Sequence, residues 1–183
     1  MANARLPEPA MPFLALLYSD REAADNAIEQ VERFLGPLDE ATESAHFTHS
    51  TYYRAEMGEP LFKRYVVFQD LADRDRIVSI KHQCASIEQH LARPGAGRSC
   101  RLVNLDPGYI TPANLLLATF KDFSHRIYLG DSVFAEITLL AARNEWVVLP
   151  WTYPDYREPS IMAFLWAARL RLLARRRDGG GRR

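Results

Sequence analysis

The order of apolar patterns along the first part of the chain limits its fold more than any other sequence feature. Residues 13–18 (FLALLY) form a short apolar run, and residues 63–69 (KRYVVFQ) form a run rich in strand-forming side chains. Both runs predict buried strands. Apolar residues at helical spacing follow each run, over residues 24–35 and residues 73–92. A strand followed by a helix therefore occurs twice.

Two further strand patterns complete this order. A polar loop leads to a weak strand at residues 45–50, and residues 101–105 form the next strand. The order β-α-β-β-α-β, with two successive strands in the middle, favours an α+β fold with a ferredoxin-like mixed sheet. A hairpin, a strand at residues 145–149 and a helix at residues 159–174 are expected to extend it.

The charge distribution separates a folded body from a basic end. Residues 169–183 hold seven Arg and one Asp, which gives them a net charge of +6 in a chain whose formal net charge is zero. We expect an N-terminal arm (residues 1–12), one α+β domain (13–174) and a basic, disordered tail (175–183). An acidic body does not fit binding of nucleic acid over a whole face, so only the tail is left for such a partner.

Several other classes of function are excluded by missing patterns. The chain has no P-loop, no GxGxxG after a strand, no HExxH and no GxSxG. His46 and His49 fall on opposite faces of a strand, so no metal site is predicted. No apolar run is long enough to span a bilayer and no signal peptide is visible, which predicts no membrane partner and a cytoplasmic location. Cys84 and Cys100 lack CxxC partners and are expected to be reduced thiols.

The candidate site begins at Asp106-Pro107-Gly108-Tyr109, whose residue types are typical of a type II turn. Asp106 either caps this turn or, with Asn104, is presented to a ligand at the end of a strand. Thr111-Pro112 suits the start of a short helix, although residues 113–120 fit a strand equally well.

A hairpin follows at HRIYLGDSVFAEITL. A three-residue loop, Gly130-Asp131-Ser132, keeps its apolar side chains on one face, places Arg126 opposite Glu136 and places Tyr128 opposite Phe134. His125 then points to the apolar side, as a half-buried structural residue or as a general base with a shifted pKa. Arg126 and Glu136 form either a structural ion pair or a site that holds a ligand carboxylate or phosphate.

Lysine is scarce in this chain. It has 20 Arg but only Lys63, Lys81 and Lys121. Where arginine fills most solvating positions, a lysine can mark a position that needs an ammonium group. Lys121, in the loop before the hairpin, is therefore predicted to contact a ligand, whereas Lys63 and Lys81 are expected to be surface charges.

Two aromatic segments accompany these residues. PWTYPDYR holds Trp151, Tyr153 and Tyr156, which either pack under the last helix or form an aromatic wall beside a ligand. The segment STYYRAEMGEPLFKR, with Tyr52 and Tyr53, could cover the same face as a lid.

Long motifs in order along the chain resemble one family. FLALLYSD, YYRAEMGEPLFKRYVVF, VNLDPGYITPANLLLATFKDFSHRIYLGDSVFAEITL and PWTYPDYR are similar to the bacterial domain-of-unknown-function family numbered four-four-one-six, over about residues 13–173. The resemblance implies a compact, stand-alone bacterial protein without an established activity. Some members carry an automatic GTP-binding label, but this sequence has neither a P-loop nor an NKxD-type motif. The family has no assigned catalytic residues, so no roles are transferred.

Together these patterns predict a protein that binds a small anionic metabolite or nucleotide, with the cofactor and any reaction left open. The expected ligand-binding residues are Asn104, Asp106, Tyr109, Lys121, Arg126, Glu136 and Tyr153. The candidates for proton transfer are Asp106, His125 and Glu136. The alternative is a non-catalytic interaction module or homo-oligomer that uses the aromatic-proline segment at residues 150–157.

Overall fold

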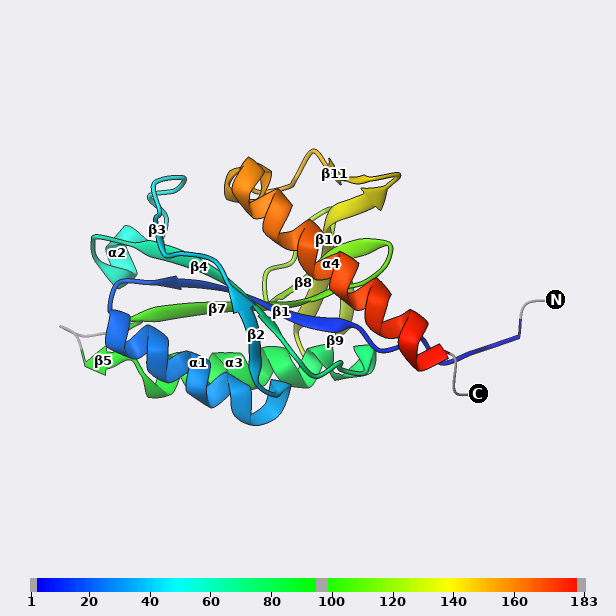
Figure 1. Cartoon of the computed structure of the whole chain (residues 1–183). Coiled ribbons are helices and arrows are strands. Elements are labelled where there is room, and N and C mark those ends of the chain that lie inside the picture. Colours follow the sequence, from blue (N-terminus) through cyan, green and yellow to red (C-terminus); the bar gives the residue numbers. More distant parts are fainter. Residues whose placement is uncertain (1–2, 95–98, 181–183) are drawn as a thin grey trace.

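The computed structural model describes residues 3–94 and 99–180 of the chain. This part has an α+β fold, as expected, and is built on one nine-stranded antiparallel sheet with helices on both faces (Figure 1). The strand order is β11-β10-β8-β7-β1-β4-β2, with β3 paired to β4 and β9 paired to β10. A separate pair, β5 and β6, forms a small ribbon.

The elements have the following bounds. The strands are β1 (Met11–Tyr18), β2 (Leu38–Ala41), β3 (Ala45–His46), β4 (Phe62–Phe68), β5 (Arg93–Pro94), β6 (Ser99–Cys100), β7 (Val103–Ile110), β8 (Asn114–Thr119), β9 (Ile127–Gly130), β10 (Val133–Ala142) and β11 (Glu145–Val148). The helices are α1 (Arg21–Leu35), α2 (Arg54–Met57), α3 (Ile77–His90) and α4 (Pro159–Gly180), with 3-10 turns η1 (Arg74–Arg76) and η2 (Pro154–Arg157).

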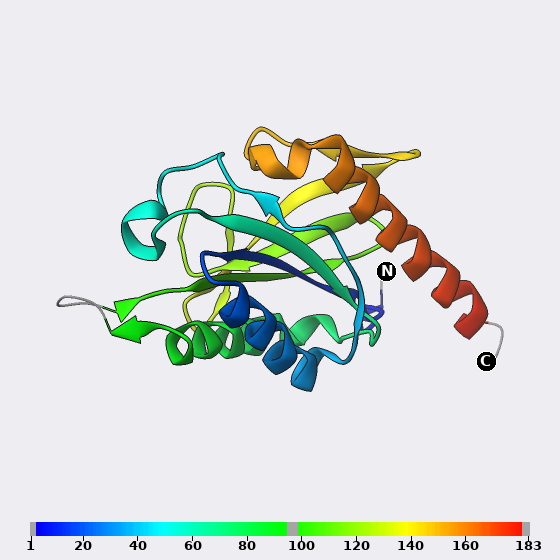
Figure 2. The same ribbon diagram turned by 60° about the vertical axis from the view of Figure 1, so that its left-hand side comes forward.

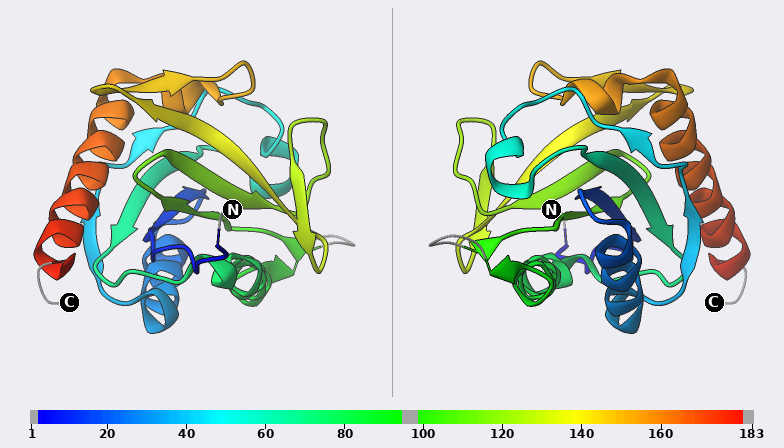
Figure 3. Two further views of the ribbon diagram at one scale, coloured as in Figure 1. Left: turned by 90° about the vertical axis from the view of Figure 1, so that its right-hand side faces the viewer. Right: turned by 90° about the vertical axis from the view of Figure 1, so that its left-hand side faces the viewer.

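Strand β1 lies in the middle of the sheet and is buried along its whole length. Its side chains alternate between two apolar clusters. Leu14 and Leu16 pack with α1 and α3, which lie next to each other on one face of the sheet (Figure 2). Phe13 and Ala15 pack with α4 on the opposite face (Figure 3). Because helices cover both faces, β1 is a continuous apolar run rather than an alternating one.

The prediction of a turn at Asp106-Pro107-Gly108 is wrong, because all three residues lie inside β7. They pair with β1, Ala15 opposite Asp106 and Leu14 opposite Pro107. On its other side β7 pairs with β8 only from Gly108 onward, so Pro107 removes no hydrogen bond from that pairing. The ambiguous residues 113–120 form strand β8 rather than a helix.

The hairpin also differs from the expectation in detail. Its loop has two residues, Asp131 and Ser132, both with positive φ (47° and 61°), and a register shift follows between Val133 and Phe134. Tyr128 does pair with Phe134, as predicted. The apolar side chains of β9 are not buried; Ile127, for example, is 69% exposed. The cause is the position of β9, which in the described structure pairs with β10 alone at the edge of the sheet.

The polar loop after α1 contains an unexpected strand, β2, which pairs with β4. Helix α4 continues to Gly180, beyond the expected end at residue 174. Residues 181–183 of the expected tail lie outside the described residues. None of the helices that the structure describes is long and apolar enough to cross a membrane.

Candidate functional site

The sheet opens between β7 and β8. The two strands pair only through Gly108, Tyr109 and Ile110 of β7, and they separate toward the beginning of β7. Gly108 permits the close approach where they do pair, because a Cβ atom there would lie 2.0 Å from the backbone oxygen of Leu116. Residues 103–107 of β7 therefore have one edge without a neighbouring strand in the part of the chain that the structure describes.

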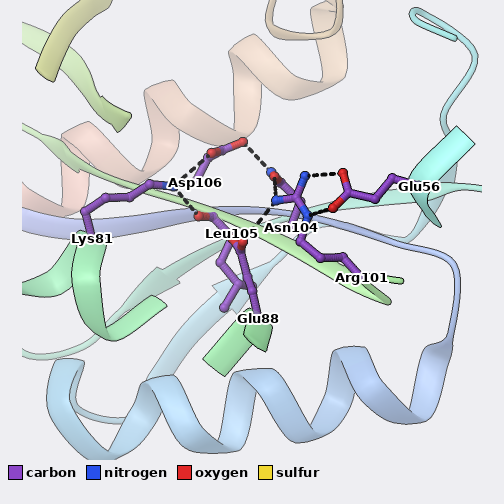
Figure 4. Close-up of polar contacts among 7 residues, drawn as sticks. All are labelled: Glu56, Lys81, Glu88, Arg101, Asn104, Leu105 and Asp106. Carbon is purple, nitrogen blue, oxygen red and sulfur yellow. Dashed lines mark hydrogen bonds and ion pairs between the residues drawn. The ribbon is translucent and has the colours of Figure 1, made fainter. Parts of the chain in front are cut away.

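Side chains of α3 bind this open edge (Figure 4). The carboxylate of Glu88 accepts a hydrogen bond from the Leu105 N–H (2.6 Å), and Lys81 Nζ donates to the Leu105 carbonyl oxygen (2.9 Å). Lys81 Nζ also lies 3.3 Å from the carboxylate of Asp106. Buried backbone groups need partners, and here charged side chains supply them instead of a strand.

A cavity of about 310 Å³ lies at the opening in the sheet. Its charged lining includes all three lysines of the chain. The expectation that Lys63 and Lys81 are surface charges is wrong, since their side chains are only 14% and 6% exposed. The lining residues are Phe47, Ser50, Tyr52, Tyr53, Lys63, Lys81, Glu88, Arg101, Asn104, Asp106, Leu117, Ala118, Thr119, Phe120, Lys121, Glu136, Tyr153, Asp155 and Tyr156.

Arg101, which lines the cavity, connects three elements (Figure 4). Its guanidinium group donates two hydrogen bonds to Glu56 of α2 (2.6 and 2.8 Å), one to Glu88 of α3 (3.0 Å) and one to Asn104 of β7 (3.0 Å). The hydrogen bonds to Glu56 are the main reason that the pKa of Arg101 is raised. Arg101 thus links α2, the helix that directly follows Tyr52 and Tyr53, to α3 and β7.

Asp106 lies where several charges meet. Burial alone would raise its pKa, but the ammonium groups of Lys81 and Lys63 outweigh this effect, so its pKa is lowered. Asn104 Nδ2 also donates a hydrogen bond to its carboxylate (2.7 Å). Burial raises the pKa of Glu88, although nearby Lys81 opposes the shift. Asp106 is therefore an ionised carboxylate between two lysines at neutral pH.

Glu136 of β10 contacts two residues of the loop before the hairpin, Arg126 and His125. Arg126 Nε donates to its Oε2 atom (2.7 Å), and His125 Nε2 lies 3.1 Å from the same oxygen. Arg126 also donates to the Tyr153 hydroxyl (2.8 Å) and to the Lys121 carbonyl oxygen (2.9 Å). Arg126 therefore positions three residues that line the cavity.

Another acidic group, Asp155 of η2, binds strand β4. Its carboxylate accepts hydrogen bonds from Lys63 Nζ and from the Tyr65 hydroxyl. Burial, and then the charge of Asp155, raise the pKa of Tyr65. The hydroxyl of neighbouring Tyr156 is buried and has no hydrogen-bond partner among the residues that the structure describes.

Lys121 differs from the other two lysines. Its ammonium group lies 4.2 Å from the ring centre of Tyr52 and 5.9 Å from that of Tyr53. Within residues 3–94 and 99–180 it forms no ion pair with a carboxylate, whereas Lys63 and Lys81 each form one. In the described structure its ammonium group is thus contacted by aromatic rings and not by a carboxylate.

The structure brings together five of the residues expected to bind a ligand: Asn104, Asp106, Lys121, Glu136 and Tyr153 all line the cavity. Arg126 and His125 instead contact Glu136 from outside the lining, and His125 stacks on Trp151 with ring centres 4.9 Å apart. Tyr109 lies elsewhere. It packs in the apolar core with residues of α1 and α3, and its hydroxyl donates to the Asp73 carbonyl oxygen.

Five charged lining residues were not expected at this site: Lys63, Lys81, Glu88, Arg101 and Asp155. The scarcity of lysine was a usable signal for Lys63 and Lys81, because the reasoning applied to Lys121 holds equally for them. Glu88 and Arg101 carry no such signal, since arginine and glutamate are common in this chain. In the described part of the chain, no three His, Cys, Asp or Glu side chains are arranged to hold a metal ion.

Comparison with models of known protein families gives a match. The model of the family described as "Domain of unknown function (DUF4416)" matches residues 8–171, which confirms the resemblance carried by the sequence motifs. No curated protein and no solved structure matches the chain.

Proposed function

Since the chain belongs to the DUF4416 family, for which no activity is described, we propose a function from the cavity alone: it binds a small anionic metabolite or nucleotide. One observation carries this proposal. A chain that uses arginine at 20 positions places all three of its lysines around one cavity. Such a concentration of ammonium groups suits the recognition of a carboxylate or phosphate.

The pairing of charges indicates which lysine faces the anion. Lys63 and Lys81 are already bound to Asp155 and Asp106, so they contribute to the local potential rather than a free donor. Lys121 retains three ammonium hydrogens without a carboxylate acceptor in the described structure. We therefore assign the direct contact with the anion to Lys121.

The size and lining of the cavity agree with a small molecule. About 310 Å³ is at the lower end of the range for ligand pockets. Tyr52, Tyr53 and Tyr153 supply aromatic surface and hydroxyl groups beside the charges. Charged groups placed beside aromatic side chains are typical of sites that orient a ligand.

Two further proposals accompany the binding function. The order β7-β1-β4-β2, with α1 after β1 and α3 after β4, supports a ferredoxin-like core within the larger sheet. A cytoplasmic location fits the two free thiols, of which Cys84 is buried and has a pKa raised by burial to about 12.

The binding function predicts a charge-dependent thermal shift. An anion that binds should raise the Tm of the purified protein by about 5–10 °C at about 100 times its Kd. In Lys121→Met its affinity should fall about 10-fold to 100-fold, because a hydrogen bond to a charged group is lost. Differential scanning fluorimetry with a panel of carboxylates and phosphates measures this shift, and native mass spectrometry detects anions that co-purify.

Arg21→Met is the matched control. It also removes one positive charge, but the Arg21 side chain is 88% exposed and does not line the cavity. Its binding should equal that of the wild type. Equal losses in both variants would mean that net charge, and not the cavity, governs binding.

An interaction module is the alternative function. Apolar side chains are exposed around the hairpin and segment 150–157, including Phe123 (62% exposed), Ile127 (69%), Tyr128 (60%) and Trp151 (37%). Clustered exposed apolar side chains often mark interaction surfaces. Light scattering tests this alternative: a dimer that Ile127→Ser converts to a monomer supports it, and a monomeric wild type contradicts homo-oligomer formation.

A further inference from the structure

One oxygen atom of Glu136 has no hydrogen-bond partner among residues 3–94 and 99–180. The residue is 3% exposed and lines the cavity. Its Oε2 atom takes the contacts from Arg126 and His125, whereas Oε1 accepts no hydrogen bond from any residue that the structure describes. A buried carboxylate oxygen left without a donor is costly. Because Glu136 lines the cavity, a donor group on an occupant is a candidate partner for the buried Oε1 atom.

Two tyrosines in the same wall offer donors. Burial raises the pKa of Tyr153 and raises that of Tyr156 well above the ordinary value, so both phenols keep their protons. The Tyr153 oxygen already accepts a hydrogen bond from Arg126, which leaves its own O–H free to donate. The Tyr156 hydroxyl is buried without a partner in the described structure. These O–H groups and Lys121 suit the oxygens of an anion.

We infer that the occupant is amphoteric: a small anion that also carries an amino or hydroxyl group. Its anionic group contacts the Lys121 ammonium and the tyrosine hydroxyls, and its amino or hydroxyl group donates to Glu136 Oε1. An anion without such a donor would leave Oε1 unpaired in a cavity that already contains this carboxylate. The inference rests on the proposed anion-binding function and narrows the class of ligand.

Arg126 determines which oxygen of Glu136 is available. Because Arg126 also binds Tyr153 and the backbone of Lys121, it holds the acceptor, one donor and the Lys121 backbone in a fixed relation. This arrangement predicts the effect of Glu136→Gln. The amide oxygen would keep the Arg126 bond and the NH2 group would take the place of Oε1, so the acceptor becomes a donor.

Two matched sets of probes test the inference by calorimetry and thermal shift. The carboxylate set is succinate, L-malate and L-aspartate, which share a skeleton but carry no donor, a hydroxyl or an ammonium group between their two carboxylates. The phosphate set is ethyl phosphate and phosphoethanolamine. In at least one set, the members with a donor should bind about 10-fold to 100-fold more tightly than the member without one. Comparing the sets shows whether the anionic group is a carboxylate or a phosphate.

In Glu136→Gln the preference should disappear or reverse, while Lys121→Met should weaken all members alike. If donor-free members bind the wild type as tightly as the others, the inference is wrong and the anion-binding function stands. If no member of either set binds, the anion-binding function itself is contradicted. A preference that persists unchanged in Glu136→Gln would also overturn the inference. The wild-type ranking decides the matter even if that variant does not fold.

Discussion

At the scale of single residues, Asp106 shows how this chain keeps a carboxylate charged in a half-buried place. Its side chain is 32% exposed and bound by Lys81, while Asn104 orients it through the second oxygen. Opposite charges within hydrogen-bond distance lower the pKa of a carboxyl group more than partial burial raises it. Such a group stabilises the folded state only when it is ionised.

This reasoning predicts how Asp106 links stability to pH. Its folded-state pKa lies below the ordinary value of 3.8, so its contribution is present above about pH 4 and is lost as the pH falls through the folded pKa. Asp106→Asn should cost about 1–2 kcal/mol of unfolding free energy at pH 7 and progressively less toward pH 3. Urea unfolding at several pH values measures the difference.

Glu88, whose pKa is raised by burial and in part by the charge of Asp106, has the opposite dependence, so the change in its pKa in Asp106→Asn offsets part of the cost. Asp25→Asn is a control, because its side chain is 58% exposed and should show a smaller cost at pH 7. A cost for Asp106→Asn that grows toward low pH would contradict the assignment of Lys81 and Lys63 as the stabilising charges.

At the scale of elements, the close contact between β7 and β8 depends on Gly108. An added Cβ atom would lie 2.0 Å from the Leu116 carbonyl oxygen, a backbone atom that cannot rotate away. Gly108→Ala should therefore destabilise the protein by about 2–3 kcal/mol, as overpacking does. It should also weaken anion binding, because β8 leads directly to Phe120 and Lys121 in the cavity wall.

Gly58→Ala gives the matched comparison. Gly58 has φ +79 but no atom near the position of a Cβ, so its cost arises from the backbone alone, about 1 kcal/mol. Thermal unfolding of both variants separates the two causes. A smaller loss in Gly108→Ala than in Gly58→Ala would mean that β7 and β8 move apart easily.

The same strand shows what the sequence could predict and what it could not. Strands β1 and β4 and helices α1 and α3 follow from their apolar periodicity, since one or two buried faces dictate it. Asp106-Pro107-Gly108 misleads, because local turn preference is weaker than pairing along β1. Part of the cavity could not be predicted, because the sequence does not show that β7 lies beside β1 and apart from β8 at Asp106, where Lys81 of α3 and the charge of Lys63 on β4 meet.

At the scale of the whole molecule, the basic helix and the acidic body neutralise each other. Arg171 binds Asp39 and Glu40, Arg175 binds Asp39 and the Gln69 carbonyl oxygen, and Arg176 binds Glu8. Much of the positive charge of residues 169–177 is therefore used within the protein. This pairing weakens the case for the tail as a nucleic-acid binder.

Removal of residues 175–183 should consequently act on stability. Losing the contacts of Arg175 and Arg176 should lower the unfolding free energy by about 1–2 kcal/mol, with a smaller loss at high salt because the ion pairs are partly exposed. Chemical unfolding at low and high ionic strength measures this. Salt-sensitive nucleic-acid binding by the full chain that vanishes on truncation would instead show that these arginines are available to a partner.

The open edge of β7 also gives the protein a natural spectroscopic reporter. Leu105 N–H donates to the Glu88 carboxylate and not to a strand. The protection of this amide against hydrogen exchange therefore depends on the side chain of Glu88, which lines the cavity. The neighbouring amides of β7 that pair with β1 exchange only when the sheet opens. The amide resonance of Leu105 would therefore report the binding of an occupant in the cavity, separately from the stability of the sheet.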